Sequence, residues 1–311
     1  MQRRFSIAAI IAVLATGSLV HSERPSATTS VIRGLSGGQG KGIFARVAFH
    51  SMRDGNSEIY TMNANGGNET SVTEDPATDM DPAISPDGRD MVFTSNRSGN
   101  NDIFLLSRHG GDPVNLTDNP FNDGWARWSP DGRQIVFHSN RDGNFEIYVM
   151  DFDGQMPTRL TDYGGIDQFP DWSPDGRKIL FRRDVDIYVL DVTTGDTERL
   201  TNAPPLNQMA TWSPDGNQIA FMSTRDGYPS VFTMNADGSQ QVNRTPKPEG
   251  DLASDWMSRA PSWSRNGKRI YFASFRPSTG GDTEVFVMNA DGSHVRRLTS
   301  AVGVDASPRA W

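Results

Sequence analysis

Four aspartates and one asparagine recur at one place in a repeated segment, and they form the candidate site of this sequence. Four of them lie five residues before the last apolar residue of a short strand-like run, and the fifth lies one residue further out, before Trp311. The set is Asp79, Asp123, Asp167, Asn207 and Asp305. Carboxylates held close together repel one another unless a cation, a proton or a basic ligand joins them. Because oxygen ligands favour Ca²⁺ or Mg²⁺, the set predicts either a divalent-cation site or a site for a basic group of a partner.

The alternative interpretation is that these aspartates cap loops by accepting hydrogen bonds from backbone amides. One repeat breaks the pattern, because Ser258 stands at the position and Asp255 is displaced from it. We expect no obligatory cofactor, and any metal would be held by the same acidic cluster.

A second charged pattern recurs in nearly every repeat, where the arginine of a Ser-x-Arg turn is followed by an acid just before the next strand. The arginines are Arg53, Arg97, Arg141, Arg225 and Arg276, and the acids are Glu58, Asp102, Glu146, Asp186 and Glu284. Catalytic ion pairs would not need to repeat in every copy. We therefore interpret these charges as pairs that face one another across a hairpin and stabilise it modestly.

No residue type or spacing in the sequence indicates a catalytic centre. The chain has no cysteine, which excludes disulfides, Cys-ligated zinc and thiol catalysis. The histidines show no metal-binding spacing, and His50 and His138 share one repeat position, where we expect strand residues packed between repeats. We therefore predict no catalytic residues.

The elements that must position these residues come from one repeated phrase. The phrase contains a Trp, a Ser-Pro-Asp-Gly turn, an apolar run ending in Phe, an Ile-Tyr run, a second Asp-Gly turn and Leu-Thr. The anchoring phenylalanines are Phe49, Phe93, Phe137, Phe181, Phe221 and Phe272. Six copies at this spacing predict a solenoid or a propeller.

Each copy divides into short apolar runs separated by turns, which is typical of strands. Pro sets φ in the Ser-Pro-Asp-Gly turn, Asp caps it and Gly takes the positive φ. Four antiparallel strands joined by three hairpins make one propeller blade. Ser307 to Trp311 repeat the inner strand with no blade after it, whereas the first blade lacks an inner strand. The sequence therefore predicts an all-β, six-bladed propeller closed by pairing of its C-terminal strand with the first blade.

The first 42 residues do not contain the repeated phrase. Arg3 and Arg4 precede an apolar run, which predicts a signal peptide over residues 1–22, followed by a flexible Ser/Thr/Gly-rich lead-in over 23–42. The propeller is expected over 43–311. These proportions favour a periplasmic or secreted protein with no membrane span in the mature chain.

The repeat phrase resembles the TolB-like propeller family, which includes the periplasmic component of the Tol–Pal envelope system. The resemblance covers Ile43 to Trp311, rests on four Ser-Pro-Asp-Gly turns in register and leaves out the N-terminal domain that precedes the propeller of TolB itself. It implies a binding propeller rather than an enzyme.

We therefore expect a monomeric scaffold that binds an envelope or secreted protein through loops at the mouth of its channel. A net charge of −8 disfavours a nucleic-acid partner. One alternative is a small hydrolase or lyase that acts on carbohydrate or peptide with a divalent cation at the acidic mouth. Another is a structural module of a larger assembly.

Overall fold

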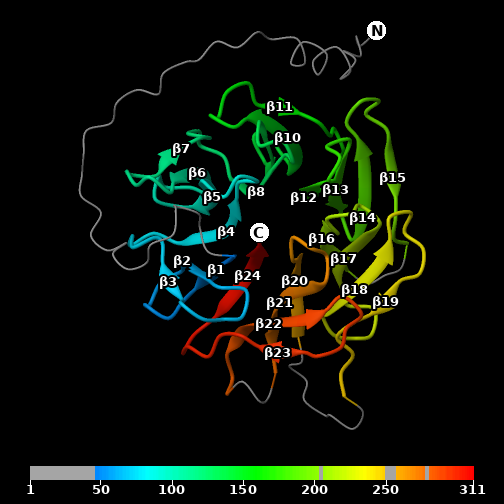
Figure 1. Cartoon of the computed structure of the whole chain (residues 1–311). Coiled ribbons are helices and arrows are strands. Elements are labelled where there is room, and N and C mark those ends of the chain that lie inside the picture. The colour runs from blue at the N-terminus through cyan, green and yellow to red at the C-terminus, as the bar shows by residue number, and fades with distance from the viewer. Residues whose placement is uncertain (1–45, 203–205, 249–256, 277–279) are drawn as a thin grey trace.

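The chain folds into six four-stranded antiparallel sheets arranged as blades around a central channel, as the computed structural model shows (Figure 1). The structure describes residues 46–202, 206–248, 257–276 and 280–311. The predicted signal peptide and lead-in lie outside these residues. Over the described part of the chain there are strands and turns but no helix, and hence no helix that could span a membrane.

Every blade has the same order of strands from the channel outward. The inner strands are β4 (Asp79–Ile84), β8 (Asp123–Trp128), β12 (Asp167–Trp172), β16 (Asn207–Trp212), β20 (Met257–Trp263) and β24 (Asp305–Ala310). The second strands are β1 (Val47–Ser51), β5 (Asp90–Ser95), β9 (Gln134–Ser139), β13 (Lys178–Arg183), β17 (Gln218–Ser223) and β21 (Arg269–Phe275). The third strands are β2 (Glu58–Met62), β6 (Asp102–Ser107), β10 (Glu146–Asp151), β14 (Asp186–Asp191), β18 (Ser230–Asn235) and β22 (Thr283–Asn289). The short outer strands are β3 (Thr70–Ser71), β7 (Val114–Asn115), β11 (Thr158–Arg159), β15 (Thr197–Arg199), β19 (Val242–Asn243) and β23 (Arg296–Arg297).

The predicted closure of the ring is confirmed. Strand β24 pairs antiparallel with β1, so the first blade combines the two ends of the described chain in the order β24-β1-β2-β3. The backbone N–H of Trp311 donates to the carbonyl of Arg46 at 2.9 Å and extends this pairing. In Figure 1, β24 leads the C-terminus to the centre of the ring. Closure gives β1 an inner neighbour, so the first blade has four strands like the others.

The one-residue offset expected in the closing copy is absent. Strand β24 runs six residues from Asp305 to Ala310, as β8 runs six residues from Asp123 to Trp128. Ala310 therefore stands where four of the other five blades place a tryptophan, and Trp311 lies one residue beyond. Asp305 therefore occupies the same position in its strand as Asp123.

The hydrophobic core lies between blades and inside them. All six anchoring phenylalanines are fully buried. Trp212 of the fifth blade packs with Leu180 of the fourth and with Phe221 of its own blade. Trp128 in the third blade also donates its indole N–H to the carbonyl of Ala83 in the second, at 3.0 Å. The inner-strand tryptophans thus join neighbouring blades, as wedges between sheets would.

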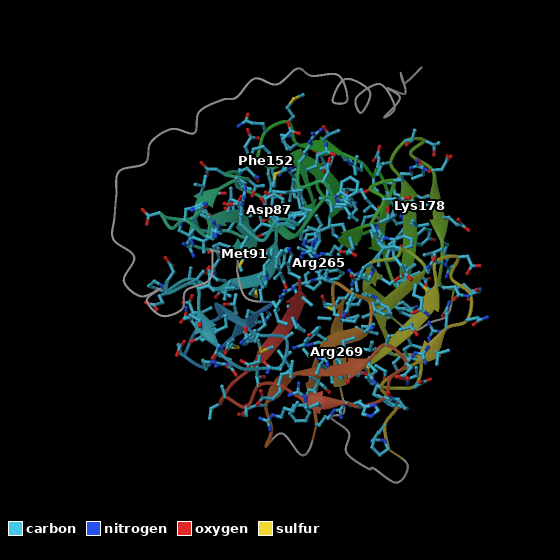
Figure 2. The ribbon with its side chains drawn as sticks, viewed as in Figure 1. Asp87, Met91, Phe152, Lys178, Arg265 and Arg269 are labelled. Atoms are coloured by element: carbon cyan, nitrogen blue, oxygen red, sulfur yellow. The ribbon has the colours of Figure 1, made fainter. Side chains whose placement is uncertain are left out.

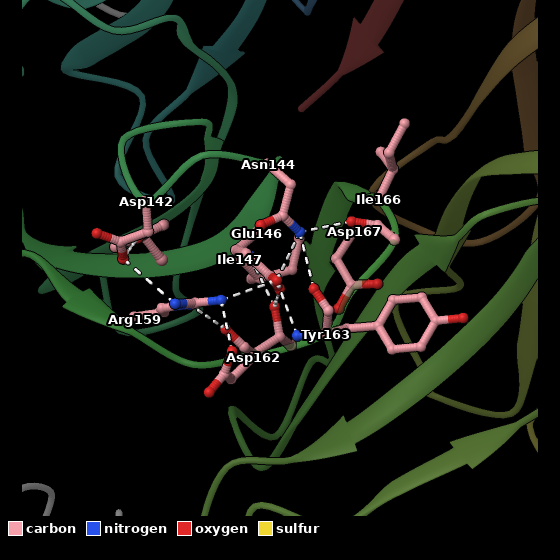
Figure 3. A network of polar contacts seen from close by, with 12 residues as sticks. Asp142, Asn144, Glu146, Ile147, Arg159, Asp162, Tyr163, Ile166 and Asp167 are labelled. Carbon is pink, nitrogen blue, oxygen red and sulfur yellow. Dashed lines mark hydrogen bonds and ion pairs between the residues drawn. The ribbon is translucent and has the colours of Figure 1, made fainter.

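In five of the six blades a buried carboxylate near the start of the third strand ties the outer edge to the following blade, as Figure 3 shows for Glu146. Glu146 is fully buried and accepts hydrogen bonds from Thr161 at 2.6 Å, from Arg159 at 2.9 Å and from the backbone of Tyr163 at 2.8 Å. Asn144 donates to the same carboxylate and to the carbonyl of Tyr163, both at 2.8 Å. This network fixes the segment that enters the next inner strand, and thereby sets where that strand begins.

Candidate functional site

The inner strands surround the channel and present equivalent residues at equivalent heights. We number their residues 1 to 6 along the strand, with position 1 at the first residue of β4, β8, β12, β16 and β24, and at Ser258 in β20. The pairing of position 1 with the second strand is the same in each blade: Asp79 lies opposite Ser95 and Asp123 opposite Ser139.

Position 1 holds all five residues of the predicted site. Each is at most 1% exposed, and each accepts a hydrogen bond from an arginine of its own blade. The pairs are Arg97–Asp79 at 2.7 Å, Arg141–Asp123 at 3.0 Å, Arg183–Asp167 at 2.7 Å, Arg225–Asn207 at 2.9 Å and Arg53–Asp305 at 2.9 Å. In the sixth blade Ser258 meets Ser274 instead, with 3.0 Å between their hydroxyl oxygens. The position-1 side chains thus form a ring of polar groups, and each is hydrogen-bonded to a residue of its own blade.

The expected pairing of each arginine with the acid before the next strand is wrong in the first three blades, where the arginine pairs with the inner-strand aspartate instead. Arg97 donates to Asp79 on the inner strand, whereas Asp102 accepts from Asn115 at 2.9 Å and from Ser98 at 2.5 Å. The guanidinium group of Arg97 also lies 5.0 Å from the ring centre of Phe104. Arginine and acid therefore belong to two separate networks, one facing the inner strand and one facing the outer edge.

These networks give each position-1 carboxylate a partner already. Within the ranges the structure covers, no three His, Cys, Asp or Glu residues gather into a group that could hold a metal ion. Binding of a cation or partner by Asp79, Asp123, Asp167, Asn207 and Asp305 stays a prediction.

Position 3 shows repeated backbone strain. All six residues there have φ between 49° and 58°, the left-handed region that non-glycine residues rarely adopt. They are Asp81, Trp125, Phe169, Met209, Ala260 and Ser307. The pairing register shifts beside each of them, as a β-bulge requires. The bulge bends the strand at the channel wall, and such strain tends to mark functional sites.

Positions 5 and 6 line a cavity of about 380 Å³ in the channel, to which every blade contributes. Position 5 carries Ala83, Arg127, Asp171, Thr211, Ser262 and Arg309. Position 6 carries Ile84, Trp128, Trp172, Trp212, Trp263 and Ala310, and Trp311 adds a further indole. The rim consists of Pro86, Pro130, Pro174, Pro214 and Arg265 from the turns after the inner strands. Pro130, Pro174 and Pro214 are exposed, so this mouth opens to solvent, and Figure 2 shows Arg265 near the centre of the ring.

The charged groups of the cavity are an arginine pair and one carboxylate. Arg127 and Arg309 are 5% and 8% exposed, and their guanidinium groups lie 4.8 Å and 5.6 Å from the ring centre of Trp125. Burial lowers the pKa of Arg127, and the neighbouring charge of Arg309 lowers it further. Burial raises the pKa of Asp171, while the charges of Arg309 and Arg127 oppose that rise. Asp171 is the carboxylate in the cavity wall beside these two guanidinium groups, and the charge of Asp81 at position 3 also raises the pKa of both arginines.

Several buried donors in the cavity wall have no acceptor among the described residues. Arg127 donates through Nη1 to the carbonyl of Ala126, but its Nε and Nη2 have no partner. The indole N–H groups of Trp172, Trp212 and Trp263 are also unpartnered. A buried donor without an acceptor costs about 1–3 kcal/mol, so a group that supplies acceptors would bind favourably here.

The repeat pattern in the sequence does not single out the charged residues of position 5. Position 5 lies one residue before the tryptophans that the repeat made prominent, and it changes in chemical type between blades, from a small apolar residue to hydroxyl, acidic and basic residues. That variation within a regular repeat was the available signal.

The comparisons with known proteins agree with this architecture. The TolB beta propeller domain family matches residues 44–125 and 116–186. TolB from Acinetobacter baumannii is 25% identical, with a TM-score of 0.74 over 85% of this chain and 66% of that one. The propeller is TolB-like. A TolB-type protein from Agrobacterium tumefaciens is also 25% identical, with a TM-score of 0.66 over 82% of this chain and 88% of that one.

More distant structures share only the fold with this TolB-like propeller. An oligogalacturonate lyase from Vibrio parahaemolyticus is 14% identical, with a TM-score of 0.53 over 83% of this chain and 73% of that one. No curated protein matches the chain. The chain spans about two thirds of the length of the Acinetobacter TolB.

Proposed function

We propose that this TolB-like propeller is a binding scaffold of the cell envelope, and that it holds a segment of a partner protein in the open mouth of its channel. The observation that carries the proposal is the aromatic and proline rim around the 380 Å³ cavity. Exposed prolines and partly exposed tryptophans present apolar surface with little side-chain entropy to lose, which favours association with a protein surface.

The location in the periplasm or outside the cell belongs to the same proposal. It is supported by the signal-peptide proportions of residues 1–22 and by the likeness to TolB. A cation-dependent hydrolase or lyase gains no support, because the described residues bring no metal-ligand group together. The proposed scaffold needs neither a catalytic residue nor a cofactor.

A capture experiment with matched variants tests the scaffold. The rim variant carries Pro130→Glu and Pro174→Glu, which place charge on the apolar mouth. The control carries Val114→Glu and Val242→Glu, exposed apolar residues of the outer strands β7 and β19 at the periphery of the ring (Figure 1).

We expect the parent and the control to retain the same dominant protein from envelope extract, and the rim variant to lose it while keeping its melting temperature within a few degrees. Equal capture by all three proteins would move the binding surface away from the channel mouth. Loss of capture by the control alone would place it on the outer strands.

A further inference from the structure

The channel cavity has the opposite charge character from the molecule as a whole. The chain carries a net charge of −8. Yet the cavity wall contains Arg127 and Arg309 against the single carboxylate of Asp171, and Arg265 stands at the rim. Such segregation of positive charge into a low-dielectric cleft focuses the field and attracts anions.

Arg127 offers a specific geometry to such an anion. Its stem and guanidinium plane are fixed by packing on Trp125 and by the bond from Nη1 to the carbonyl of Ala126. The remaining Nε and Nη2 donors form one edge of the guanidinium fork, and both are buried without a partner among the described residues. This edge matches the two oxygens of a carboxylate, which arginine binds with two parallel hydrogen bonds.

The second arginine raises the expected affinity. Arg309 supplies a second guanidinium group, which lies 5.6 Å from the centre of the same Trp125 ring. Asp171 accepts the backbone N–H of Trp212 at 3.0 Å through one oxygen, and its single negative charge offsets only part of the charge of the two arginines. Two like charges held together in a buried wall repel each other, and a bound anion relieves that repulsion.

Three indole N–H groups add further donors to the wall, beside the acceptor oxygens of Asp171, Thr211 and Ser262. Trp172, Trp212 and Trp263 each carry an unpartnered indole N–H. An indole N–H can only donate, so these groups cannot satisfy one another or the arginines. The complement of this wall is therefore rich in acceptors and negatively charged.

We propose that the channel cavity is a carboxylate-binding site in which the Nε–Nη2 edge of Arg127 holds the two oxygens and Arg309 supplies the second positive charge. This rests on the proposed function in one respect: in a scaffold, the carboxylate is an acidic side chain of the partner segment that enters the mouth. A free small carboxylate would use the same donors, and the experiment separates the two sources.

The test is isothermal titration calorimetry of the full chain with three probes. Acetyl-tri-glutamate amide presents peptide carboxylates, citrate presents small-molecule carboxylates, and acetyl-tri-glutamine amide is the uncharged control. The key variant is Arg127→Met, which keeps the stem on Trp125 and removes the charge. Arg309→Met is the second variant. Arg141→Met is the matched control, since Arg141 is partly buried over aromatic rings as well but already paired with Asp123.

We expect tri-glutamate to bind the parent and tri-glutamine not to bind. Arg127→Met should weaken binding about tenfold or more, the loss expected for a charged hydrogen-bonding group. Arg309→Met should weaken it in the same direction, and Arg141→Met should leave it unchanged. Binding of citrate but not of the peptide would keep the site and assign it to a small carboxylate.

The unliganded variants give a second readout. Because Arg127 is buried without a full set of partners, Arg127→Met should melt at the same temperature as the parent or higher, whereas Arg141→Met should melt lower. The inference is overturned if neither carboxylate probe binds, or if Arg127→Met binds as the parent does, or if Arg141→Met loses as much. The capture experiment with the rim variant tests the scaffold function separately. Either proposal can therefore be contradicted while the other one stands.

Discussion

The buried polar residues of the inner strands divide into two kinds. At position 1 each carboxylate has an arginine partner from its own blade, as in the pair of Asp123 and Arg141. At position 5 the arginines exceed the carboxylates, and donors are left without acceptors. The paired charges at position 1 stabilise each blade. The donors without acceptors at position 5 leave hydrogen-bonding groups in the channel wall that a ligand could use.

The asparagine of the fifth blade shows what position 1 requires. Asn207 accepts from Arg225 through its amide oxygen at 2.9 Å, so an uncharged acceptor fits the geometry. We predict that Asp123→Asn costs about 1 kcal/mol of stability, because the hydrogen bond survives without full charge. Asp123→Ala should cost about 3 kcal/mol, since it leaves Arg141 without its buried partner. Urea unfolding of the two variants measures the difference, and equal costs would contradict this account.

His138 should make the stability depend on pH. Burial, together with the charges of Arg182 and Arg127, lowers its pKa from 6.5 to about 3. The neutral ring contacts Phe169 of the next blade and accepts that residue's backbone N–H at 3.4 Å. Because the folded pKa lies below the unfolded one, the unfolded chain takes up the proton first as the pH falls. The stability contributed by neutral His138 is therefore full above about pH 6.5 and declines toward pH 3.

The predicted slope from His138 is at most about 1.4 kcal/mol per pH unit within that window. His138→Asn retains an acceptor near the position of Nδ1 but does not titrate there. The free energy of unfolding of the variant should fall less steeply than that of the parent between pH 6 and about pH 4. Parallel pH profiles would show that His138 does not titrate with unfolding.

At the scale of the element, the inner strand is defined by its bulge. The residue at position 3 adopts a left-handed conformation in all six blades, although none of the six is glycine. The bulge turns positions 5 and 6 toward the cavity while position 1 stays in the sheet with its arginine. Strain in each strand is thus part of how the channel is built.

The bulge in β20 gives a direct test. Ala260 has a φ of 51° and is 5% exposed. We predict that Ala260→Gly changes stability by less than about 1 kcal/mol, because relief of left-handed strain offsets the lost methyl contact. Ala260→Val should cost about 2 kcal/mol or more, because a β-branched side chain is poorly tolerated there.

Ala210, at position 4 of β16, is the control for this prediction. It is buried and is not among the residues with positive φ. Ala210→Gly should therefore cost about 1 kcal/mol, since glycine weakens an ordinary strand. Thermal melts of the three variants decide the matter, and a larger loss for Ala260→Gly than for Ala210→Gly would show that position 3 is unstrained.

At the scale of the whole molecule, stability depends on closing the ring. Strand β24 lies between β1 of its own blade and the inner strands β20 and β4 of the neighbouring blades. Deleting residues 307–311 would leave β1 without its inner neighbour and open the channel wall. We predict that the melting temperature falls by roughly 10 °C or more, which corresponds to several kcal/mol.

Arg309→Met serves as the control, because it changes a channel side chain and keeps the pairing of β24 with β1. Its melting temperature should stay within a few degrees of the parent or rise. If the deletion variant melted together with the parent in a calorimetric scan, the terminal strand would not be what holds the ring closed.

Much of the fold was determined by the sequence alone. The anchoring phenylalanines, the Ser-Pro-Asp-Gly turns and the unpartnered strand at Ser307 predicted six four-stranded blades and the closure of the ring. Such patterns are readable because strand alternation and turn conformation depend on residues close together in the chain. Asp79, Asp123, Asp167, Asn207 and Asp305 all lie at the start of inner strands, and ligand binding by these residues stays a prediction.

Only the tertiary structure decided what those residues contact and what the channel contains. Arg97 could face Asp102 or Asp79, and the packing of the second strand against the inner strand selected Asp79. Arg127, Asp171 and Arg309 are separated by 44 and 138 residues in the sequence, and they share one cavity wall because six bulged strands close around one axis. A local pattern carries no information about which strands meet across that axis, so the charge of the channel emerges only when the ring is closed.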